Sequence, residues 1–97
     1  MLPAARLGDM TAHGTPLGPG PGSANVLIEG KPAWRVGMDT HACPLVSGVV
    51  PHGGGAVPVG STTVLINNAP AVRMTDTIVE ATAPNTIAQG ATTVFIG

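Results

Sequence analysis

Three histidines and one cysteine are the residues of this chain whose types suit a metal ion. They are His13, His41, Cys43 and His52, and the chain holds no other His or Cys. Three imidazoles and one thiolate form a donor set that suits a closed tetrahedral zinc site. His41 and Cys43 stand two residues apart, which places both side chains on one face of an extended segment. The set therefore predicts one zinc ion per chain.

The spacing of these residues leaves a plainer interpretation open. A single histidine in a polar loop is more often solvated than bound to a metal. A lone cysteine is more often a small buried hydrophobe. The spacing also lacks a standard zinc signature such as paired Cys-x-x-Cys. The joint count favours a metal, because every His and the only Cys fall between positions 13 and 52.

The same four residues favour a structural ion over a catalytic one. A catalytic zinc keeps one coordination position open for water, whereas four candidate ligands fill the shell. No His-Glu-x-x-His motif occurs, and Pro44 directly follows Cys43, the candidate nucleophile. We therefore predict no catalytic residues and no enzymatic activity. A small zinc hydrolase and a metal-storage module remain the alternatives, and iron in place of zinc stays open.

Two alternating motifs repeat along the chain, and internal repeats decide the architecture. The first opens with Gly and ends in Val-x-Ile, at residues 22–28, 60–66 and 90–96. The second reads Pro-Ala-x-Arg with an Asp soon after, at residues 3–9, 32–39 and 70–76. One unit is split, because its first motif is C-terminal and its second is N-terminal. A closed ring satisfies this order, so we predict a pseudo-threefold monomer whose termini lie close together.

The repeats also predict an all-β fold with little helix. Their first motifs are rich in Val, Ile and Thr, as short strands are, and no stretch sustains the 3.6-residue apolar spacing of a helix. Each complete unit returns to Pro-Ala within a few residues, which indicates hairpin-like turns. The repeated Arg and Asp residues form either surface pairs, worth about 0–1 kcal/mol each, or a packed structural element.

Composition excludes several classes of function. The 97 residues predict a single domain spanning 1–97. Charged residues make up 9% and the net charge is -1, which argues against nucleic acid and against polybasic membrane binding. No apolar stretch is long enough for a spanning helix, and no signal peptide is evident. A single Cys excludes an internal disulfide and indicates synthesis in a reducing compartment.

Together these motifs resemble a known family. Pro3-Ala4-Ala5-Arg6 spells the motif that names the PAAR-repeat proteins, and the repeats and the His/His/Cys/His set match from end to end. The sequence resembles a minimal PAAR-repeat protein. The resemblance implies a small cone-shaped β fold with pseudo-threefold symmetry. It also implies a structural Zn²⁺ near the vertex, held by His13, His41, Cys43 and His52.

The resemblance further implies a partner and a destination. Such proteins sit on the tip of the VgrG spike trimer of the bacterial type VI secretion system, one copy per trimer, and help to puncture target envelopes. We expect this chain to be cytoplasmic before firing and then secreted to the extracellular space or target cell, without stable membrane insertion. We expect no fused effector extension, so effectors would bind noncovalently. The expected contact residues are Val26, Ile28, Val64, Ile66, Val94 and Ile96 or their alternates, and the sequence does not decide which alternate faces the spike.

Overall fold

Short paired strands make up the architecture. The computed structural model describes residues 1–42, 46–47, 50–51, 54–80 and 84–97. These residues contain no helix, and their strands pair two by two in antiparallel fashion. The all-β fold class is confirmed. The strands are β1 (Leu2–Pro3), β2 (Pro19–Gly20), β3 (Leu27–Ile28), β4 (Lys31–Pro32), β5 (Thr40–His41), β6 (Val46–Ser47), β7 (Val50–Pro51), β8 (Leu65–Ile66), β9 (Ala69–Pro70), β10 (Thr77–Ile78), β11 (Asn85–Thr86) and β12 (Phe95–Ile96).

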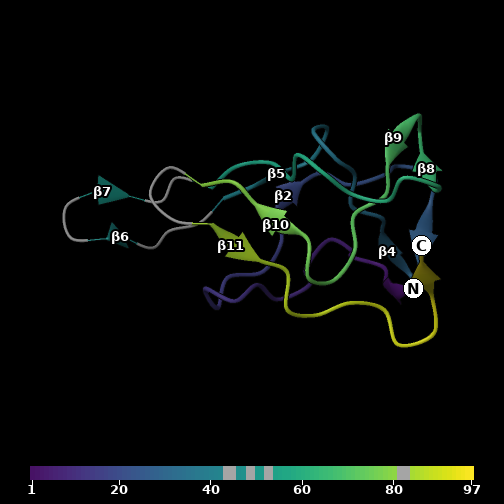
Figure 1. Ribbon diagram of the computed structural model, residues 1–97, viewed down its shortest axis with the longest axis horizontal. Coiled ribbons are helices and arrows are strands. Elements are labelled where there is room, and N and C mark those ends of the chain that lie inside the picture. The colour runs from purple at the N-terminus through teal and green to yellow at the C-terminus, as the bar shows by residue number, and fades with distance from the viewer. Residues whose placement is uncertain (43–45, 48–49, 52–53, 81–83) are drawn as a thin grey trace.

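The molecule is elongated and its two ends differ. Its principal extents are 38 × 23 × 22 Å. Three strand pairs, β1–β12, β3–β4 and β8–β9, gather at one end, which we call the wide end (Figure 1). The β6–β7 pair lies at the opposite, narrow end, with the β2–β5 and β10–β11 pairs between them (Figure 1). The six strand pairs are therefore distributed along the long axis, from the wide end to the narrow end (Figure 1).

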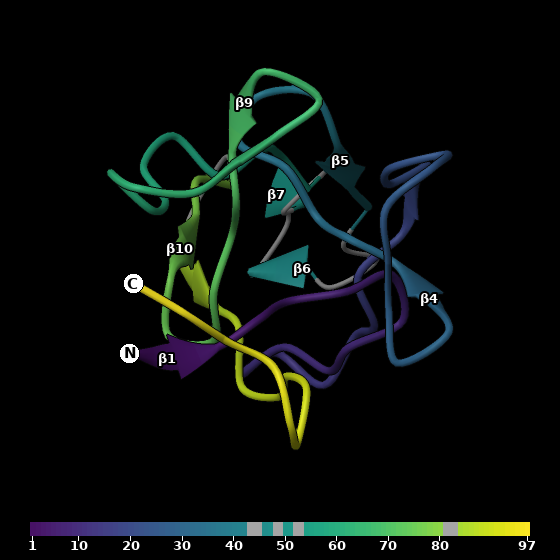
Figure 2. The ribbon, with the colours of Figure 1, turned by 90° about the vertical axis from the view of Figure 1, so that its right-hand side faces the viewer.

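The three strand pairs of the wide end are equivalent hairpins. Glu29–Gly30 joins β3 to β4 and Asn67–Asn68 joins β8 to β9, and all four turn residues have positive φ. Two such residues form the type I′ turn that suits tight hairpins. Strands β1 and β12 pair in the same register, with Leu2 opposite Ile96. The two chain ends therefore meet in a third hairpin, which confirms that the termini lie together (Figure 2).

The Pro-Ala-x-Arg segments form a closed ring of backbone hydrogen bonds. Ala5 N donates to Val72 O at 3.0 Å, Val72 N donates to Trp34 O at 3.1 Å, and Trp34 N donates to Ala5 O at 3.1 Å. Each residue occupies the third position of its motif, and each unit donates to one neighbour while accepting from the other. Figure 2 shows the hairpins of the three units arranged around the long axis. This cycle confirms the predicted pseudo-threefold arrangement.

Two hydrophobic clusters fill the interior. The cluster at the wide end consists largely of matched residues from the three units: Ala4, Ala33, Ala71, Ile28, Ile66, Ile96 and Ala91, with Val26, Val64 and Val94 packed against them. The second cluster combines unlike side chains: Ala5, Leu17, Trp34, Val57, Val72, Ile78 and Ile87, with Leu7 and Val36. The threefold repeat is therefore close at the wide end and looser beyond the ring.

Close backbone contact explains why each strand motif opens with glycine. A Cβ at Gly60 would lie 2.4 Å from the carbonyl oxygen of Ala71, which is far inside van der Waals contact. A Cβ at the equivalent Gly22 or Gly90 would lie 2.7 Å or 2.8 Å from the Cβ atom of Pro32 or Pro3. Any larger residue would push the strand motif away from the ring.

Candidate functional site

The repeated Arg and Asp residues form three clamps, of which two are buried and the Arg73–Asp76 clamp is partly buried. In each unit one carboxylate oxygen accepts the backbone N–H of the Arg, and both oxygens bind its guanidinium. Asp9 and Asp39 are fully buried. The shortest N–O distances are 2.7 Å for Arg6–Asp9, 2.8 Å for Arg35–Asp39 and 3.0 Å for Arg73–Asp76. The clamps are therefore packed structural elements and not loose surface pairs.

Two of these clamps raise the pKa of their guanidinium groups, as expected of paired charges. Hydrogen bonds from the side chain of Arg6 to Asp9 raise the pKa of Arg6 above its ordinary value. Asp39 raises the pKa of Arg35 in the same way, and burial opposes the shift in both cases. Bidentate pairs of this kind fix geometry as well as charge. The clamps thereby hold each Pro-Ala-x-Arg segment in place.

Each clamp also joins its unit to a neighbouring hairpin turn. Arg6 Nη1 donates to Glu29 at 2.8 Å, and Arg35 Nη1 donates to Asn67 at 3.3 Å. Arg73 Nη1 donates to the carbonyl oxygen of Gly97 at 3.2 Å. Because Gly97 follows β12 as Glu29 follows β3 and Asn67 follows β8, the three contacts are equivalent. We call them the three junctions of the wide end.

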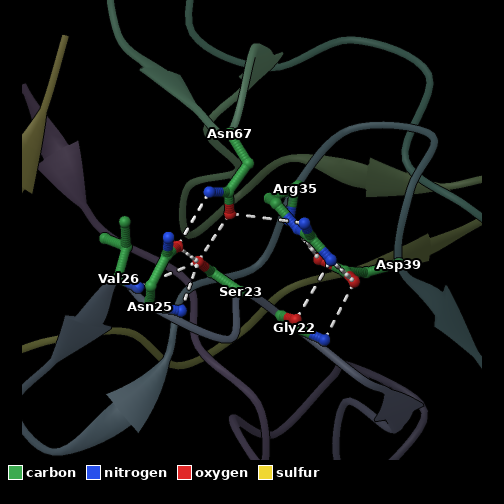
Figure 3. Close-up of polar contacts among 7 residues, drawn as sticks. All are labelled: Gly22, Ser23, Asn25, Val26, Arg35, Asp39 and Asn67. Atoms are coloured by element: carbon green, nitrogen blue, oxygen red, sulfur yellow. Dashed lines mark hydrogen bonds and ion pairs between the residues drawn. The ribbon is translucent and has the colours of Figure 1, made fainter.

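The junction at Asn67 shows how the contact is built (Figure 3). Ser23 Oγ donates to Asn67 Oδ1 at 2.6 Å, and Asn67 Nδ2 donates to Asn25 Oδ1 at 2.8 Å. The Ser23 hydroxyl also accepts the N–H of Val26 at 2.9 Å, which shapes the start of strand β3. One amide side chain thus links a turn, a clamp and the neighbouring strand motif.

At the equivalent junction a carboxylate performs this task. Glu29 accepts hydrogen bonds from the backbone N–H and hydroxyl groups of Thr92 and Thr93. Hydrogen bonding from Thr93 first, and from Thr92, lowers the pKa of Glu29 to about 2, although partial desolvation opposes this. The ionised carboxylate is therefore the form that closes this junction.

The wide end exposes an apolar side chain on each hairpin. Leu27 is 59% exposed, Leu65 63% and Phe95 48%. The neighbouring isoleucines named by the sequence analysis, Ile28, Ile66 and Ile96, are buried in the core, and Val26, Val64 and Val94 are partly buried. Successive side chains of a strand point to opposite faces, and here the isoleucines point inward. The alternates that the sequence left open are therefore the exposed set.

Two of the four predicted metal ligands lie among the described residues. His41 ends strand β5 and is buried, while the side chain of His13 is 18% exposed. Cys43 and His52 lie outside the described residues. Among the part of the chain that the structure describes, no group of three or more His, Cys, Asp or Glu is arranged to hold a metal. The four-residue site therefore stays a prediction.

The structure brings both of these histidines to one acidic residue that sequence analysis missed. Nδ1 of His13 lies 3.2 Å from Oε1 of Glu80, and Nε2 of His41 lies 3.8 Å from Oε2. The carboxyl side chain of Glu80 is fully buried. Two of the predicted ligands therefore direct a ring nitrogen toward the same carboxylate.

A buried amide anchors this cluster. Asn85 is fully buried in β11, and its Nδ2 donates to Glu80 Oε2 at 3.0 Å and to Thr11 Oγ1 at 2.9 Å. Its Oδ1 accepts the backbone N–H of His13 at 3.1 Å. One side chain thereby fixes both the carboxylate and the backbone that carries an imidazole.

The environment of His41 favours a neutral imidazole. Burial lowers its pKa most, and the charge of His13 lowers it further, while the Glu80 carboxylate and the Pro16 carbonyl oppose the shift. Nε2 lies 3.1 Å from the hydroxyl of Thr15, and the buried Nδ1 makes no hydrogen bond to any described residue. A neutral, preoriented imidazole is the form that ligates a metal.

The repeat spacing held a signal for Glu80. His13, Cys43 and Glu80 each stand four residues after the Asp of their own unit. Two residues after the Asp, by contrast, the three units hold Thr11, His41 and Ile78, and no carboxylate. Comparing the units four residues after each Asp would have grouped this carboxylate with two of the candidate ligands.

A closed pseudo-threefold ring of Pro-Ala-x-Arg segments defines a small all-β class of domain. The family model described as PAAR motif matches residues 7–79, and the chain belongs to this family. The family is a structural one, associated with the spike tip of type VI secretion systems and generally non-enzymatic. A search of curated proteins gave no match. Among the described residues, no helix could cross a membrane.

Proposed function

We propose that this chain is a non-enzymatic tip that caps the VgrG spike trimer of a type VI secretion system, one copy per trimer. The observation that carries this proposal is the wide end, where three equivalent hairpins surround one axis. Each hairpin exposes a large apolar side chain at the same position, which holds Leu27, Leu65 or Phe95. A single chain thereby offers three similar surfaces to a threefold-symmetric partner.

The three hairpins of the wide end suit a partner that exposes three strand edges. A trimeric β structure ends in three equivalent edges, whose unpaired backbone groups need a partner. Short hairpins placed around one axis could pair with all three edges at once, while the exposed apolar side chains are removed from water. A partner with a single chain at this end would leave two of the three surfaces uncovered.

A structural zinc ion completes the proposal, placed in the narrow half, by which we mean the part of the molecule between the Pro-Ala-x-Arg ring and the narrow end. His13, His41, Cys43 and His52 would hold it. Support comes from His13 and His41, whose ring nitrogens approach the same buried carboxylate. When bound, zinc would tie the loops of the narrow half together and stiffen the end that meets the target envelope. The family's structural character favours neither a zinc hydrolase nor a metal-storage module.

The proposal also includes the localisation of the protein. As part of a spike it would leave the cytoplasm with the secreted assembly and reach the extracellular space or the target cell. Effectors carried with it would bind noncovalently.

Gel filtration with multi-angle light scattering, using a purified VgrG trimer, tests the docking. We expect a complex of one chain per trimer. Asp at Leu27, Leu65 and Phe95 together should abolish it, because three carboxylates would replace the apolar contacts. Val79→Asp is the matched control, because Val79 is 58% exposed but adjoins strand β10, away from the wide end (Figure 1). Three chains per trimer, or unchanged binding by the triple variant, would reject the proposal.

A further inference from the structure

Glu80 and His13 occupy equivalent positions of two units in the narrow half, each four residues after the repeat Asp. After each repeat Asp, the chain runs exposed, then buried, then exposed: Met10, Thr11 and Ala12; Thr40, His41 and Ala42; Thr77, Ile78 and Val79. At the next position two units place a side chain that is mostly removed from solvent. This position holds His13 in one unit and Glu80 in another. The repeat therefore delivers a carboxylate to the position at which another unit carries the candidate metal ligand His13.

The contacts of Glu80 orient an imidazole. Its Oε1 lies at hydrogen-bonding distance from Nδ1 of His13, 3.2 Å away, and its Oε2 is held by the amide of Asn85 at 3.0 Å. A carboxylate accepts only, so the proton of this contact belongs to Nδ1 of His13. Nε2 of His13 then carries the lone pair. The contact thus selects one tautomer of His13.

The net charge of a zinc-loaded centre also favours a role for the Glu80 carboxylate. The chain has four Lys and Arg residues. The three arginines are committed to the clamps, and Lys31 lies in β4 at the wide end. A zinc ion with three neutral imidazoles and one thiolate carries a net charge of +1, which is costly to bury alone. The carboxylate of Glu80 would neutralise it.

We propose that Glu80 is a positioning residue of the metal centre, an inference that rests on the proposed zinc site. By accepting the Nδ1 proton of His13, its carboxylate leaves Nε2 of His13 to face the ion, and it balances the charge of the loaded centre. Carboxylates that hold a ligating histidine in this way raise the affinity of the site for its metal. Glu80 itself does not ligate the ion.

Zinc affinity, measured by competition with a chelating dye, tests this role. Glu80→Ala should weaken zinc binding about 10–100-fold, the range found when such partners are lost. Glu80→Gln should weaken it less, because the amide oxygen still accepts from Nδ1 but carries no charge. Glu29→Gln is the matched control, since Glu29 is the only other glutamate and lies at the wide end. Its zinc affinity should equal that of the unaltered chain.

A second measurement needs no variant. Long-range ¹H–¹⁵N correlation spectra of the zinc-loaded chain should show a proton on Nδ1 of His13 and a metal-shifted Nε2. A metal-bound Nδ1, or equal zinc affinity in Glu80→Ala and the unaltered chain, would overturn the role of Glu80. A chain that binds no zinc would overturn it as well. Docking to the trimer is scored separately, so its failure would leave the Glu80 result standing.

Discussion

The wide end and the narrow half are built from the same three repeats but use them differently. At the wide end the units supply matched residues, such as Ile28, Ile66 and Ile96, and these pack against one another around the axis. Beyond the ring, equivalent positions hold unlike groups, as His13 and Glu80 do. Identical neighbours suit close packing about an axis, whereas a polar cluster requires donors and acceptors of different kinds. One repeated backbone thus carries a symmetric surface and an asymmetric site.

Removing zinc should produce the largest difference in stability between the narrow half and the wide end. Structural zinc contributes on the order of 10–16 kcal/mol of apparent binding free energy in small domains, so its loss should be the largest effect. Hydrogen exchange after chelation should show lost protection at His41 and Val79, whose amides bond within the narrow half. The ring amides of Ala5, Trp34 and Val72 should keep more of theirs.

The same comparison can be made with Cys43→Ser, which removes one proposed ligand and should mimic chelation. Elemental analysis of protein purified without an affinity metal should give about one zinc per chain. Equal loss of protection at both ends would contradict the division into two regions. Unchanged stability after chelation would contradict the zinc site.

Breaking one clamp should have the next largest effect. Asp39→Ala removes the buried partner of Arg35 and should lower the free energy of unfolding by more than about 2 kcal/mol, because a partly buried guanidinium loses its acceptor. Asp76→Ala should cost less, since the side chain of Arg73 is 20% exposed and that of Arg35 is 10%. Urea unfolding followed by Trp34 fluorescence measures both. Equal losses would show that burial does not rank the clamps.

Closing the third hairpin covalently should have a moderate effect of the opposite sign. In the pairing of β12 with β1, Gly97 and Met1 occupy the places of the two turn residues. Joining them directly, with Gly in place of Met1 to allow positive φ, should raise the free energy of unfolding by about 1–3 kcal/mol through a less disordered unfolded chain. The thermal midpoint of the cyclised chain against the linear Met1→Gly variant measures this. A lower midpoint would show that the third hairpin differs from the other two.

The smallest effect should distinguish two of the three junctions by the pH dependence of stability. The pKa of Glu29 is lowered to about 2 in the folded chain, whereas its ordinary value is 4.5. The unfolded chain therefore takes up the proton first, so the contribution of Glu29 is complete above pH 4.5 and declines as pH falls toward 2. Glu29→Gln should lose this dependence in urea unfolding between pH 6 and 2. Asn67→Ala, at the junction without a titrating group, should shift stability equally at every pH.

The architecture could be predicted from the sequence because the order of the repeats determines it. The split unit predicted that the chain ends meet, and the pairing of Leu2 with Ile96 confirms this. The sequence did not decide which side chains of the short hairpins face outward. A two-residue strand such as β3 has too little alternation to reveal its buried face, and only the packed ring turns Ile28 inward and leaves Leu27 exposed.

The candidate site was predicted only in part, for a different physical reason. Ligand types are visible in a sequence, so His13 and His41 could be grouped by chemistry alone. Glu80 belongs to the cluster through tertiary contacts with Asn85 and His13, which no local spacing encodes. Only the alignment of equivalent positions across units could have indicated it.

The meeting of β1 and β12 has a consequence for anything attached to this domain. Both ends of the polypeptide emerge beside each other at the wide end (Figure 2). A tag or cargo fused to either terminus would lie beside the proposed docking surface, on the side of the molecule away from the narrow end. The narrow end would stay free of the fusion. A bulky fusion with a short linker would clash with the spike at the docking surface.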